Sequence, residues 1–459
     1  MYVSITAKFL SLFMSLVMFF NGLSFGTAGD SVKINYDFSN DTRGSASGTV
    51  TLDAKTDGEY DLYWGNKNDE KLTFPVGGYD VTYSEFATVD VDDGKGSADI
   101  QSFTAIPDGA ESVLVYKNCV LKAKQDLPEE KITDNGETIY KFGALSDVHF
   151  NRYYATLFDD SLTTFPNALN FLDKCGVDLV AMSGDLSSRG ERNAFEKFNK
   201  CAKNVNYPVL TCTGNHDVND DEKGLDVDSW HEFVNTGVYG ETKMEGVVNV
   251  APNQVDFVYS PEAINGDVFI FLSQYRWDYN SENSCILTDE QLDWLGDQLE
   301  AYKDETVYLF FHTFVQNCYE NEDINMGEGN LINEEGVRYN LIYTPGTPDE
   351  IRFRNYLKEY KNVIYFNGHS HWSYEMQKFN PNLNIADYDG EYATMVHVSS
   401  VSSPRIIKKA DSKDRTEQNM KRSEGMLISV YENRIVINSV DFLKGKMLAY
   451  ATYNIELEK

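Results

Sequence analysis

Short apolar stretches separated by turn residues fill the first part of the chain, residues 30–124. The stretches GTVTLDA, YDLYW, VTYSEFATVDV and SVLVYKNCVL either alternate apolar and polar positions or run through β-branched and aromatic residues. Turn sequences such as DDGKG and IPDG separate them, and no helical pattern interrupts them. This spacing predicts a small all-β sandwich. The polar, proline-containing stretch 125–137 is typical of a linker.

A different pattern begins near residue 138. Five continuous apolar runs have the length and composition of buried parallel strands, and helical patterns lie between them. The runs are YKFGAL (140–145), DLVAMS (178–183), YPVLTC (207–212), TVYLFF (306–311) and NVIYF (362–366). Thr288 and Gln291 form a predicted capping box at the start of one helix. With the strand patterns at about 424–456, the pattern predicts a layered α/β domain over 138–459.

Composition and charge exclude some classes of function. Hydrophobic residues make up 42% of the 459 residues and aromatic residues 13%, which is enough for packed cores, so a disordered chain is excluded. The formal net charge is −32. A protein dedicated to binding nucleic acid would need a stripe of Lys and Arg to displace counterions, so we expect no dedicated nucleic-acid binding.

The first 28 residues have the pattern of an export signal. Lys8 precedes the uncharged apolar run 9–20, and small residues precede a predicted cleavage point after Ala28. We therefore expect residues 1–28 to be a cleaved signal peptide and the mature protein to be secreted or extracytoplasmic. The alternative is a retained N-terminal membrane anchor, because the uncharged stretch Phe9–Gly29 has 21 residues, the length of a span.

The six cysteines leave the redox state open. An even number in an exported chain permits disulfides, but the spacings match no known framework and no C-x-x-C occurs. The cysteines are Cys119, Cys175, Cys201, Cys212, Cys285 and Cys318.

Polar residues of metal-binding type follow each of the five buried runs. In parallel α/β sheets, ligands bind just beyond the carboxyl ends of the strands. Five of the seven histidines lie at such ends. In chain order the groups are Asp147 and His149; Asp185; Asn215, His216 and Asp217; His312; and His369 and His371.

Each group alone has a plain structural explanation, since Asp185 could be a turn residue and residues 215–217 could bond their own backbone. His231, in a predicted helix, and His397, inside a predicted strand, keep that structural interpretation. The placement of five groups at five strand ends is not explained by packing, and it predicts a metal centre. Imidazole and carboxylate ligands favour Mn, Fe or Zn over Mg or Ca.

The ordered set D-x-H, G-D, G-N-H-D, H and G-H-x-H resembles the calcineurin-like metallophosphoesterase superfamily over roughly residues 138–400. The resemblance implies a four-layer α-β-β-α sandwich, here preceded by an immunoglobulin- or fibronectin-like domain at 30–124, and a dinuclear site at the strand ends. It assigns one divalent or trivalent ion to Asp147, His149, Asp185 and His371. It assigns the other to Asp185, Asn215, His312 and His369, so that Asp185 bridges the two ions.

The resemblance also implies a reaction. Two such metals, about 3.5–4 Å apart, clamp phosphoryl oxygens and lower the pKa of a bridging water, whose hydroxide would attack phosphorus. His216, which is not a ligand in the family pattern, would protonate the leaving alkoxide, and Asp217 would orient His216. Two dications against two carboxylates and one hydroxide leave a net positive charge, which draws an anion into an acidic protein.

Two departures separate this chain from better-known relatives. Purple acid phosphatases are similar in joining an N-terminal β-sandwich to this fold, but they carry a tyrosine metal ligand in G-D-x-x-Y, where this chain has Ser188. A tyrosinate–iron centre is therefore not expected. Arg189 follows in GDLSSRG, similar to the G-D-x-x-D-R-G of protein Ser/Thr phosphatases, whose arginine binds phosphate. Arg189 is either such a contact or a surface arginine at a helix start.

The resemblance, together with the export signal, implies an exported phosphohydrolase that cleaves small phosphomonoesters or phosphodiesters, nucleotides among them. The alternative is a non-catalytic surface-binding protein that acts through the N-terminal β-sandwich, for which contact with a cell surface or a glycan is left open. A further alternative is a non-catalytic binding protein that uses the metal site as a scaffold. His216 and Asp217 argue against that alternative, because a scaffold has no use for an acid catalyst.

Overall fold

The structure is a computed structural model, and it describes residues 31–39, 44–132, 136–150, 161–218, 224–264, 266–274, 287–313, 348–378, 384–387, 390–407, 417–419 and 421–457. The predicted signal peptide, Cys285 and Cys318 lie outside the described residues. Cys119, Cys175, Cys201 and Cys212 are free thiols. Within the described ranges, no helix combines the length and apolar character needed to cross a membrane.

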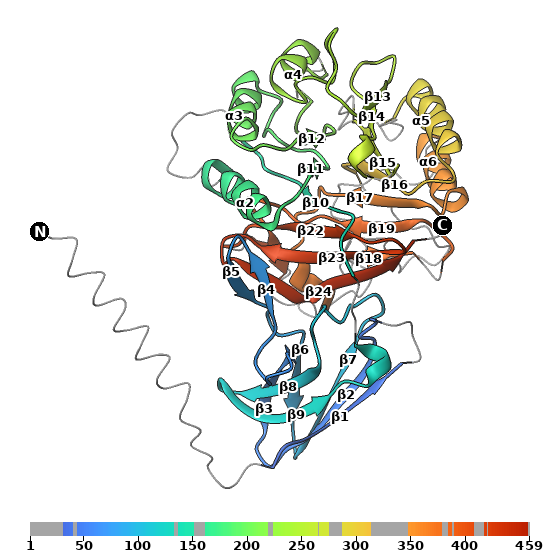
Figure 1. Cartoon of the computed structure of the whole chain (residues 1–459). Helices are drawn as coiled ribbons and strands as arrows, with labels where there is room; N and C mark the ends of the chain where they lie inside the picture. The colour runs from blue at the N-terminus through green and yellow to red at the C-terminus, as the bar shows by residue number, and fades with distance from the viewer. Residues whose placement is uncertain are drawn as a thin grey trace, which may run out of the picture.

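The first of two large sheets has six strands in the order β12-β11-β10-β22-β23-β24 (Figure 1). β10, β11 and β12 are parallel and confirm the first three predicted runs. β22 pairs antiparallel with β10, so the C-terminal strands extend this sheet. The strands are β10 (Tyr140–Leu145), β11 (Leu179–Met182), β12 (Val209–Thr211), β22 (Glu424–Val430), β23 (Arg434–Asp441) and β24 (Lys446–Glu456).

The second large sheet has seven strands in the order β13-β14-β15-β16-β17-β19-β18. β15, β16, β17 and β19 are parallel, and β16 and β17 confirm the last two predicted runs. The sequence analysis missed the buried strand β15. The strands are β13 (Val247–Val250), β14 (Phe257–Tyr259), β15 (Val268–Leu272), β16 (Val307–Phe311), β17 (Val363–Asn367), β18 (Ile385–Ala386) and β19 (Thr394–His397).

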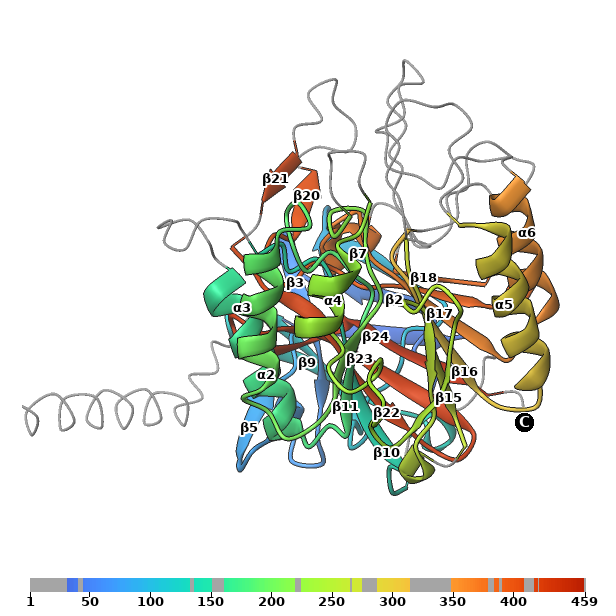
Figure 2. The same cartoon turned by 90° about the horizontal axis from the view of Figure 1, so that it is seen from above.

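Alternate residues of these strands enter different apolar cores, which explains why the runs are apolar throughout. In β11, Leu179 and Ala181 pack in the core between the two sheets, whereas Val180 and Met182 pack toward the helices. Figure 2 shows α2, α3 and α4 beside the first sheet and α5 and α6 beside the second. The helices are α2 (Ser161–Cys175), α3 (Arg192–Ala202), α4 (Val227–Phe233), α5 (Asp289–Ala301) and α6 (Pro348–Glu359).

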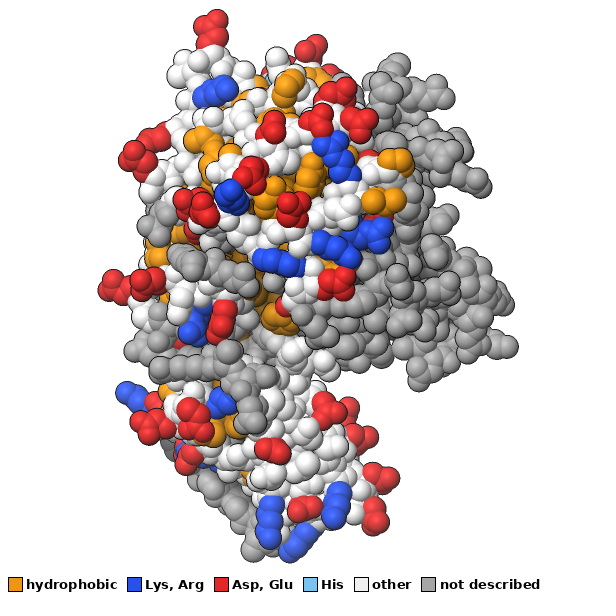
Figure 3. All heavy atoms as spheres, turned by 90° about the vertical axis from the view of Figure 1, so that its right-hand side faces the viewer, with side chains coloured by type: hydrophobic (Ala, Val, Ile, Leu, Met, Phe, Trp, Pro, Cys, Tyr) orange, Lys and Arg blue, Asp and Glu red, His pale blue; other side chains and the backbone are white. Residues whose placement is uncertain are grey.

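The helix α5 illustrates how local sequence sets these elements. The capping box of Thr288 and Gln291 is confirmed, with the Thr288 hydroxyl accepting from the Gln291 N–H and the Gln291 side chain accepting from the Thr288 N–H. Leu292, Leu295 and Leu299 then lie on one face and pack against the second sheet. Figure 3 shows the face of the molecule that carries α5 and α6, where acidic and basic side chains are interspersed.

The N-terminal region is rich in strands, as predicted, and forms three small antiparallel sheets. Their orders are β1-β2-β7, β6-β3-β8-β9 and β4-β5. The strands are β1 (Lys33–Phe38), β2 (Gly48–Asp53), β3 (Gly58–Gly65), β4 (Thr73–Val76), β5 (Tyr79–Thr82), β6 (Ala87–Val91), β7 (Lys95–Ile100), β8 (Ser112–Lys117) and β9 (Val120–Asp126).

The N-terminal strands are hydrogen-bonded to the last strand of the first large sheet. Ser84 N–H donates to the Met447 carbonyl at 2.9 Å, and Ala105 N–H donates to the Thr452 carbonyl at 2.8 Å. One continuous apolar core contains buried residues of both regions. The short segments η1 (Glu129–Lys131), η2 (Glu262–Ile264) and η3 (Tyr374–Lys378) and the two-stranded sheet of β20 (Arg405–Ile407) and β21 (Glu417–Asn419) complete the fold.

Candidate metal centre at the strand ends

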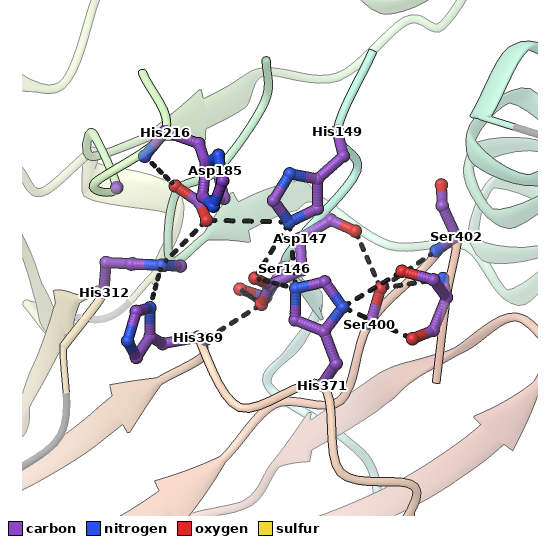
Figure 4. A network of polar contacts seen from close by, with 12 residues as sticks. Ser146, Asp147, His149, Asp185, His216, His312, His369, His371, Ser400 and Ser402 are labelled. Atoms are coloured by element: carbon purple, nitrogen blue, oxygen red, sulfur yellow. Dashed lines mark hydrogen bonds and ion pairs between the residues drawn. The ribbon is translucent and has the colours of Figure 1, made fainter. Parts of the chain in front are cut away.

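The predicted ligand groups of both large sheets meet at one place (Figure 4). The groups that follow β10, β11 and β12 face those that follow β16 and β17. Backbone hydrogen bonds join neighbouring turns: Asp147 N–H donates to the Gly184 carbonyl at 3.1 Å, and Gly368 N–H donates to the His312 carbonyl at 3.0 Å. Each of these bonds joins two turns of one sheet, and the His369 N–H, which donates to Oδ2 of Asp147 at 3.0 Å, links the turns of the two sheets.

The backbone of these turns is left-handed at five of the predicted ligands. The φ angles are 55° at Asp147, 52° at His149, 54° at Asp185, 77° at His369 and 62° at His371. This conformation costs a residue with a side chain about 1–2 kcal/mol, although Asp and His adopt it more readily than most residues. Clusters of such strain occur at functional sites, where the surrounding structure holds them in place.

Two glycines are required here because polar atoms approach them closely. A Cβ atom on Gly214 would overlap the Asp185 carboxylate and lie 2.6 Å from the Asp185 nitrogen. A Cβ atom on Gly368 would overlap the Ser146 hydroxyl and lie 2.7 Å from Oδ2 of Asp147. Both contacts are far inside the normal van der Waals range, so a larger residue would displace a predicted ligand.

One group of side chains consists of Asp147, His149 and His371. The Nε2 atoms of the two histidines lie 2.9 Å apart, and Oδ1 of Asp147 lies 3.0 Å from Nε2 of His371. Nδ1 of His371 contacts the Ser403 hydroxyl at 3.0 Å and the Ser403 carbonyl at 3.3 Å. Because a carbonyl only accepts, Nδ1 carries the hydrogen, which leaves the Nε2 lone pair directed at the group.

A second group consists of Asp185, His312 and His369, with Asn215 beside it. Nε2 of His312 lies 3.1 Å from Oδ2 of Asp185, 3.1 Å from Oδ1 of Asn215 and 3.2 Å from Nδ1 of His369. The Nδ1–H of His312 donates to the Ser183 carbonyl at 2.7 Å. That bond fixes the ring with Nε2 directed at the group. Burial opposes the charged form of His312, but Asp185 raises the pKa of this ring to about 9, so Nε2 would bind a metal by giving up its proton.

Asp185 lies between the two groups. Its Oδ2 atom, 3.1 Å from Nε2 of His312, is also 3.6 Å from Nε2 of His149. Its Oδ1 atom accepts a hydrogen bond from the His216 backbone N–H at 2.8 Å. One carboxylate is therefore within reach of both sets of imidazoles, which is the position a bridging ligand needs.

Charge and burial set the protonation of the site. Burial and the neighbouring His312 lower the pKa of His369 to about 3, and burial lowers the pKa of His371 to about 4, so both rings are neutral and able to bind a metal. Burial opposes the charged form of Asp185, but His312 and His216 hold the pKa of this carboxyl below its ordinary value. Asp185 is thus ionised, as a metal ligand must be.

His216 is near the site, but its partner differs from the predicted one. Nδ1 of His216 lies 2.9 Å from the Ser188 carbonyl, to which it donates. The Asp217 carboxylate instead accepts from three backbone N–H groups, those of Leu186, Ser187 and Gly214, and from the Ser187 hydroxyl. The expectation that Asp217 orients the His216 ring is not met, because these four donors already hold the carboxylate beneath the turns.

Arg189 is exposed at the rim of the site. It follows Ser188, whose carbonyl binds His216, and its backbone N–H donates to the Glu191 carboxylate at 3.0 Å. Among the described residues, no carboxylate forms an ion pair with the Arg189 guanidinium within 4 Å. Both explanations of Arg189, a phosphate contact or a surface residue, are compatible with this position.

Several residues that support the site were missed by the sequence analysis. Ser146 donates to Oδ2 of Asp147 at 2.6 Å, and Ser400 donates to the Asp147 carbonyl at 2.8 Å. Ser273 accepts from the Thr213 N–H at 3.1 Å, just before the Gly214 turn. The serine-rich stretch VSSVSSPR at 398–405 was a visible signal for the Ser400 contact, since it has no other obvious reason to be so polar within a buried region.

The donor set fits metal ions. Three groups each have ligand atoms within 4.8 Å of one another: Asp147, His149 and His371; His149, Asp185 and His216; and Asp185, His312 and His369. The members are imidazole nitrogens and carboxylate oxygens, and all except His149 and His216 are buried. Buried groups of this kind, crowded at hydrogen-bond distances from one another, are typical of a site that a cation completes.

Comparison with known proteins agrees with this chemistry. Residues 140–373 match the family model described as calcineurin-like phosphoesterase. No curated protein matches the chain.

Among solved structures, a dimetal phosphatase from Danio rerio is 13% identical, with 70% of this chain and 100% of that chain covered and a TM-score of 0.42. A purple acid phosphatase isolated from yellow lupin (Lupinus luteus) seeds is also 13% identical, with 93% of this chain and 74% of that chain covered and a TM-score of 0.43. Likenesses at this level establish neither activity nor substrate. The family match covers more than half of the 459 residues, and we conclude that the chain belongs to the calcineurin-like phosphoesterase family and is a metal-dependent phosphoester hydrolase.

Proposed function

We propose that the protein is an exported phosphohydrolase that cleaves small phosphomonoesters or phosphodiesters, nucleotides among them. The observation that carries the proposal is the position of the Asp185 carboxylate between His149 and His312, at 3.6 Å and 3.1 Å. A site with one shared carboxylate and imidazoles on both sides supports two metal ions rather than one. We assign these ions to the class Mn, Fe or Zn from the donor types.

Each of the two proposed metal positions takes the side chains of one of the two contact groups described above. Asp147, His149 and His371 would hold one ion, and His312, His369 and Asn215 the other, with Asp185 shared. When bound, such a pair polarises a phosphoryl group and lowers the pKa of a water molecule. The chain itself supplies the orientation: the Ser183 carbonyl fixes the ring of His312, and Ser403 fixes the ring of His371.

His216 is the proposed general acid. Its Nδ1–H is held by the Ser188 carbonyl at 2.9 Å, so Nε2 is the ring atom left to exchange a proton with the leaving alkoxide. Its ring centroid is 4.9 Å from that of His149, at the edge of the metal groups rather than within them. In this proposal Asp217 acts indirectly, since its carboxylate ties the turn of Asp185 to the turn of Gly214.

Hydrolysis of p-nitrophenyl phosphate and bis-p-nitrophenyl phosphate tests the function. The purified protein would be stripped with a chelator and reloaded with Mn, Fe or Zn in separate samples. We expect turnover of at least one substrate that the chelator abolishes and the metal restores. Absence of turnover on both substrates and on a panel of nucleotides would refute the proposal, and the ratio of the two rates separates monoesterase from diesterase activity.

The finer architecture and the location belong to the same proposal. Two sheets with helices on their outer sides favour a four-layer sandwich, and the N-terminal sheets favour an immunoglobulin- or fibronectin-like unit over 30–124. Export with cleavage after Ala28 would be tested by sequencing the N-terminus of protein recovered from an expressing culture. A mature chain beginning at Gly29 supports cleavage, and a chain retained in the membrane fraction supports the anchor.

A further inference from the structure

Glu424, the first residue of β22, is a buried carboxylate that none of the predicted ligand motifs includes. Its side chain is 0% exposed. Oε1 accepts from the Ser373 hydroxyl at 2.9 Å, and Oε2 accepts from the Ser399 hydroxyl at 2.9 Å and from the Tyr374 N–H at 3.1 Å. Both carboxylate oxygens of Glu424 therefore accept hydrogen bonds from the two loop segments that contain Ser373 and Ser399.

Those two segments hold His371 in position. Ser373 and Tyr374 lie two and three residues after His371 in the chain. Ser399 begins the serine stretch whose Ser403 contacts Nδ1 of His371 at 3.0 Å. Glu424 thus holds together the loop that carries the imidazole and the loop that sets its ring orientation.

Arg422 supplies the countercharge for Glu424. Its Nη1 atom lies 3.4 Å from Oε1 of Glu424, and its Nη2 atom lies 2.8 Å from the Glu375 carboxylate. Burial raises the pKa of Glu424, and the pairing with Arg422 opposes that rise and so favours the ionised form, which accepts at both oxygens. The Tyr374 N–H and the Arg422 guanidinium cannot become acceptors, so an uncharged amide at position 424 would place its NH₂ group against a donor.

We propose that Glu424 is a positioning residue for His371, and that it sets the affinity of the metal position formed by Asp147, His149 and His371. The inference rests on the proposed dinuclear site and deepens it, because it separates the two metal positions. The second position depends on His312, which is fixed by Ser183, and on His369, whose Nδ1 lies 3.2 Å from Nε2 of His312. Neither of those contacts involves Glu424.

Asp441 provides a matched control for this role. It is 1% exposed, lies directly opposite Glu424 in the register of β22 and β23, and its Oδ2 atom is 3.8 Å from Nε of the same Arg422. Its remaining contacts are with Lys444 of its own turn. Replacement of Asp441 therefore removes a buried charge beside Arg422 and leaves the histidine loops untouched.

The test measures Mn²⁺ binding rather than turnover. Wild type, Glu424→Gln and Asp441→Asn would be equilibrated with Mn²⁺ against a graded chelator, and bound metal counted by elemental analysis. In Glu424→Gln we expect one of two Mn²⁺ ions to bind about 10–100-fold more weakly, the range seen when a residue supporting a ligand is lost. Asp441→Asn should bind both ions with wild-type affinity. Unchanged affinities in Glu424→Gln, or equal weakening of both ions in both variants, would overturn the proposal.

Two further variants cover the case in which Glu424→Gln does not fold, as judged by near-UV circular dichroism. Ser373→Ala removes one hydroxyl donor to Glu424 and should weaken the same single Mn²⁺ ion by a smaller factor. Ser112→Ala, which removes the hydroxyl of a buried serine of β8, should leave the affinity for both Mn²⁺ ions unchanged. A wild type that binds two Mn²⁺ ions but hydrolyses no ester refutes the proposed function alone, whereas a wild type that binds fewer than two ions refutes this inference as well.

Discussion

The Asp185 carboxylate lies 3.1 Å from Nε2 of His312, although the two residues follow strands of different sheets. Asp185 follows β11 of the six-stranded sheet, and His312 follows β16 of the seven-stranded sheet. Their contact therefore crosses the boundary between the two sheets. Removal of the Asp185 charge should therefore affect both metal positions, whereas removal of a ligand that belongs to one position should affect only that position.

The variant Asp185→Asn should lose metal and activity together. The amide keeps the size of the side chain but cannot supply a negative oxygen to two cations. We expect kcat/KM on p-nitrophenyl phosphate to fall by more than about a hundredfold, beyond the loss usual for supporting residues. Elemental analysis should show fewer than two metal ions per chain. A variant with two tightly bound ions would contradict the shared position of Asp185.

Gly214→Ala should disturb the same carboxylate through the backbone. The added Cβ would lie 2.6 Å from the Asp185 nitrogen and overlap the Asp185 carboxylate, so Asp185 must move. We expect metal affinity to fall at least about tenfold, in the range for displaced supporting groups. Gly240→Ala is the matched control, because the nearest atom to its Cβ is 3.9 Å away. Equal metal affinity in the two alanine variants would show that the close approach at Gly214 is not needed.

His216→Ala should separate binding from chemistry. The Nδ1 atom of His216 is held by the Ser188 carbonyl, and the ring is not needed by either proposed set of ligands. We expect metal content to be retained and kcat to fall by about 10²–10⁴, the usual contribution of general acid catalysis. A substrate with a better leaving group should lose less, because it needs less protonation. Wild-type turnover in this variant would refute the assigned role.

Asp256 should make the stability of the protein depend on pH. Burial raises the pKa of Asp256 to about 6, from an ordinary value of about 3.9. Between these values the folded protein binds more protons than the unfolded chain, so the free energy of unfolding falls as pH rises. The expected loss is about 2 kcal/mol from pH 4 to pH 6.

Urea unfolding of the chelated protein at a series of pH values measures this effect. The comparison is with Asp256→Asn, which does not titrate, so the difference between the two curves isolates Asp256 from other groups. Asp256 also accepts from the Ser273 N–H at 2.7 Å, and the Asn variant should be less stable at every pH. Parallel curves for the two proteins would contradict the raised pKa.

The strands and the polar residues after them were predictable because both are local signals. An apolar run followed at once by Asp or His marks a strand end in the sequence alone, as at His312. The partners of those residues were not predictable. Ser400 and Asp147 are 253 residues apart in the chain, and no periodicity connects them. The Asp217 carboxylate accepts hydrogen bonds from backbone N–H groups because the turn that carries Asp185 lies against it. Only the folded chain reveals this contact.

The left-handed backbone at Asp147, His149, Asp185, His369 and His371 restricts what these positions can become. Asp, Asn, His and Gly are the residues that adopt this conformation at low cost, and all except Gly have a side chain that can bind a metal. The geometry of the turns and the chemistry of the ligands thus select the same few amino acids. Natural variation or laboratory selection that alters metal preference should therefore change the residues around these turns, while the turn positions keep to this short set.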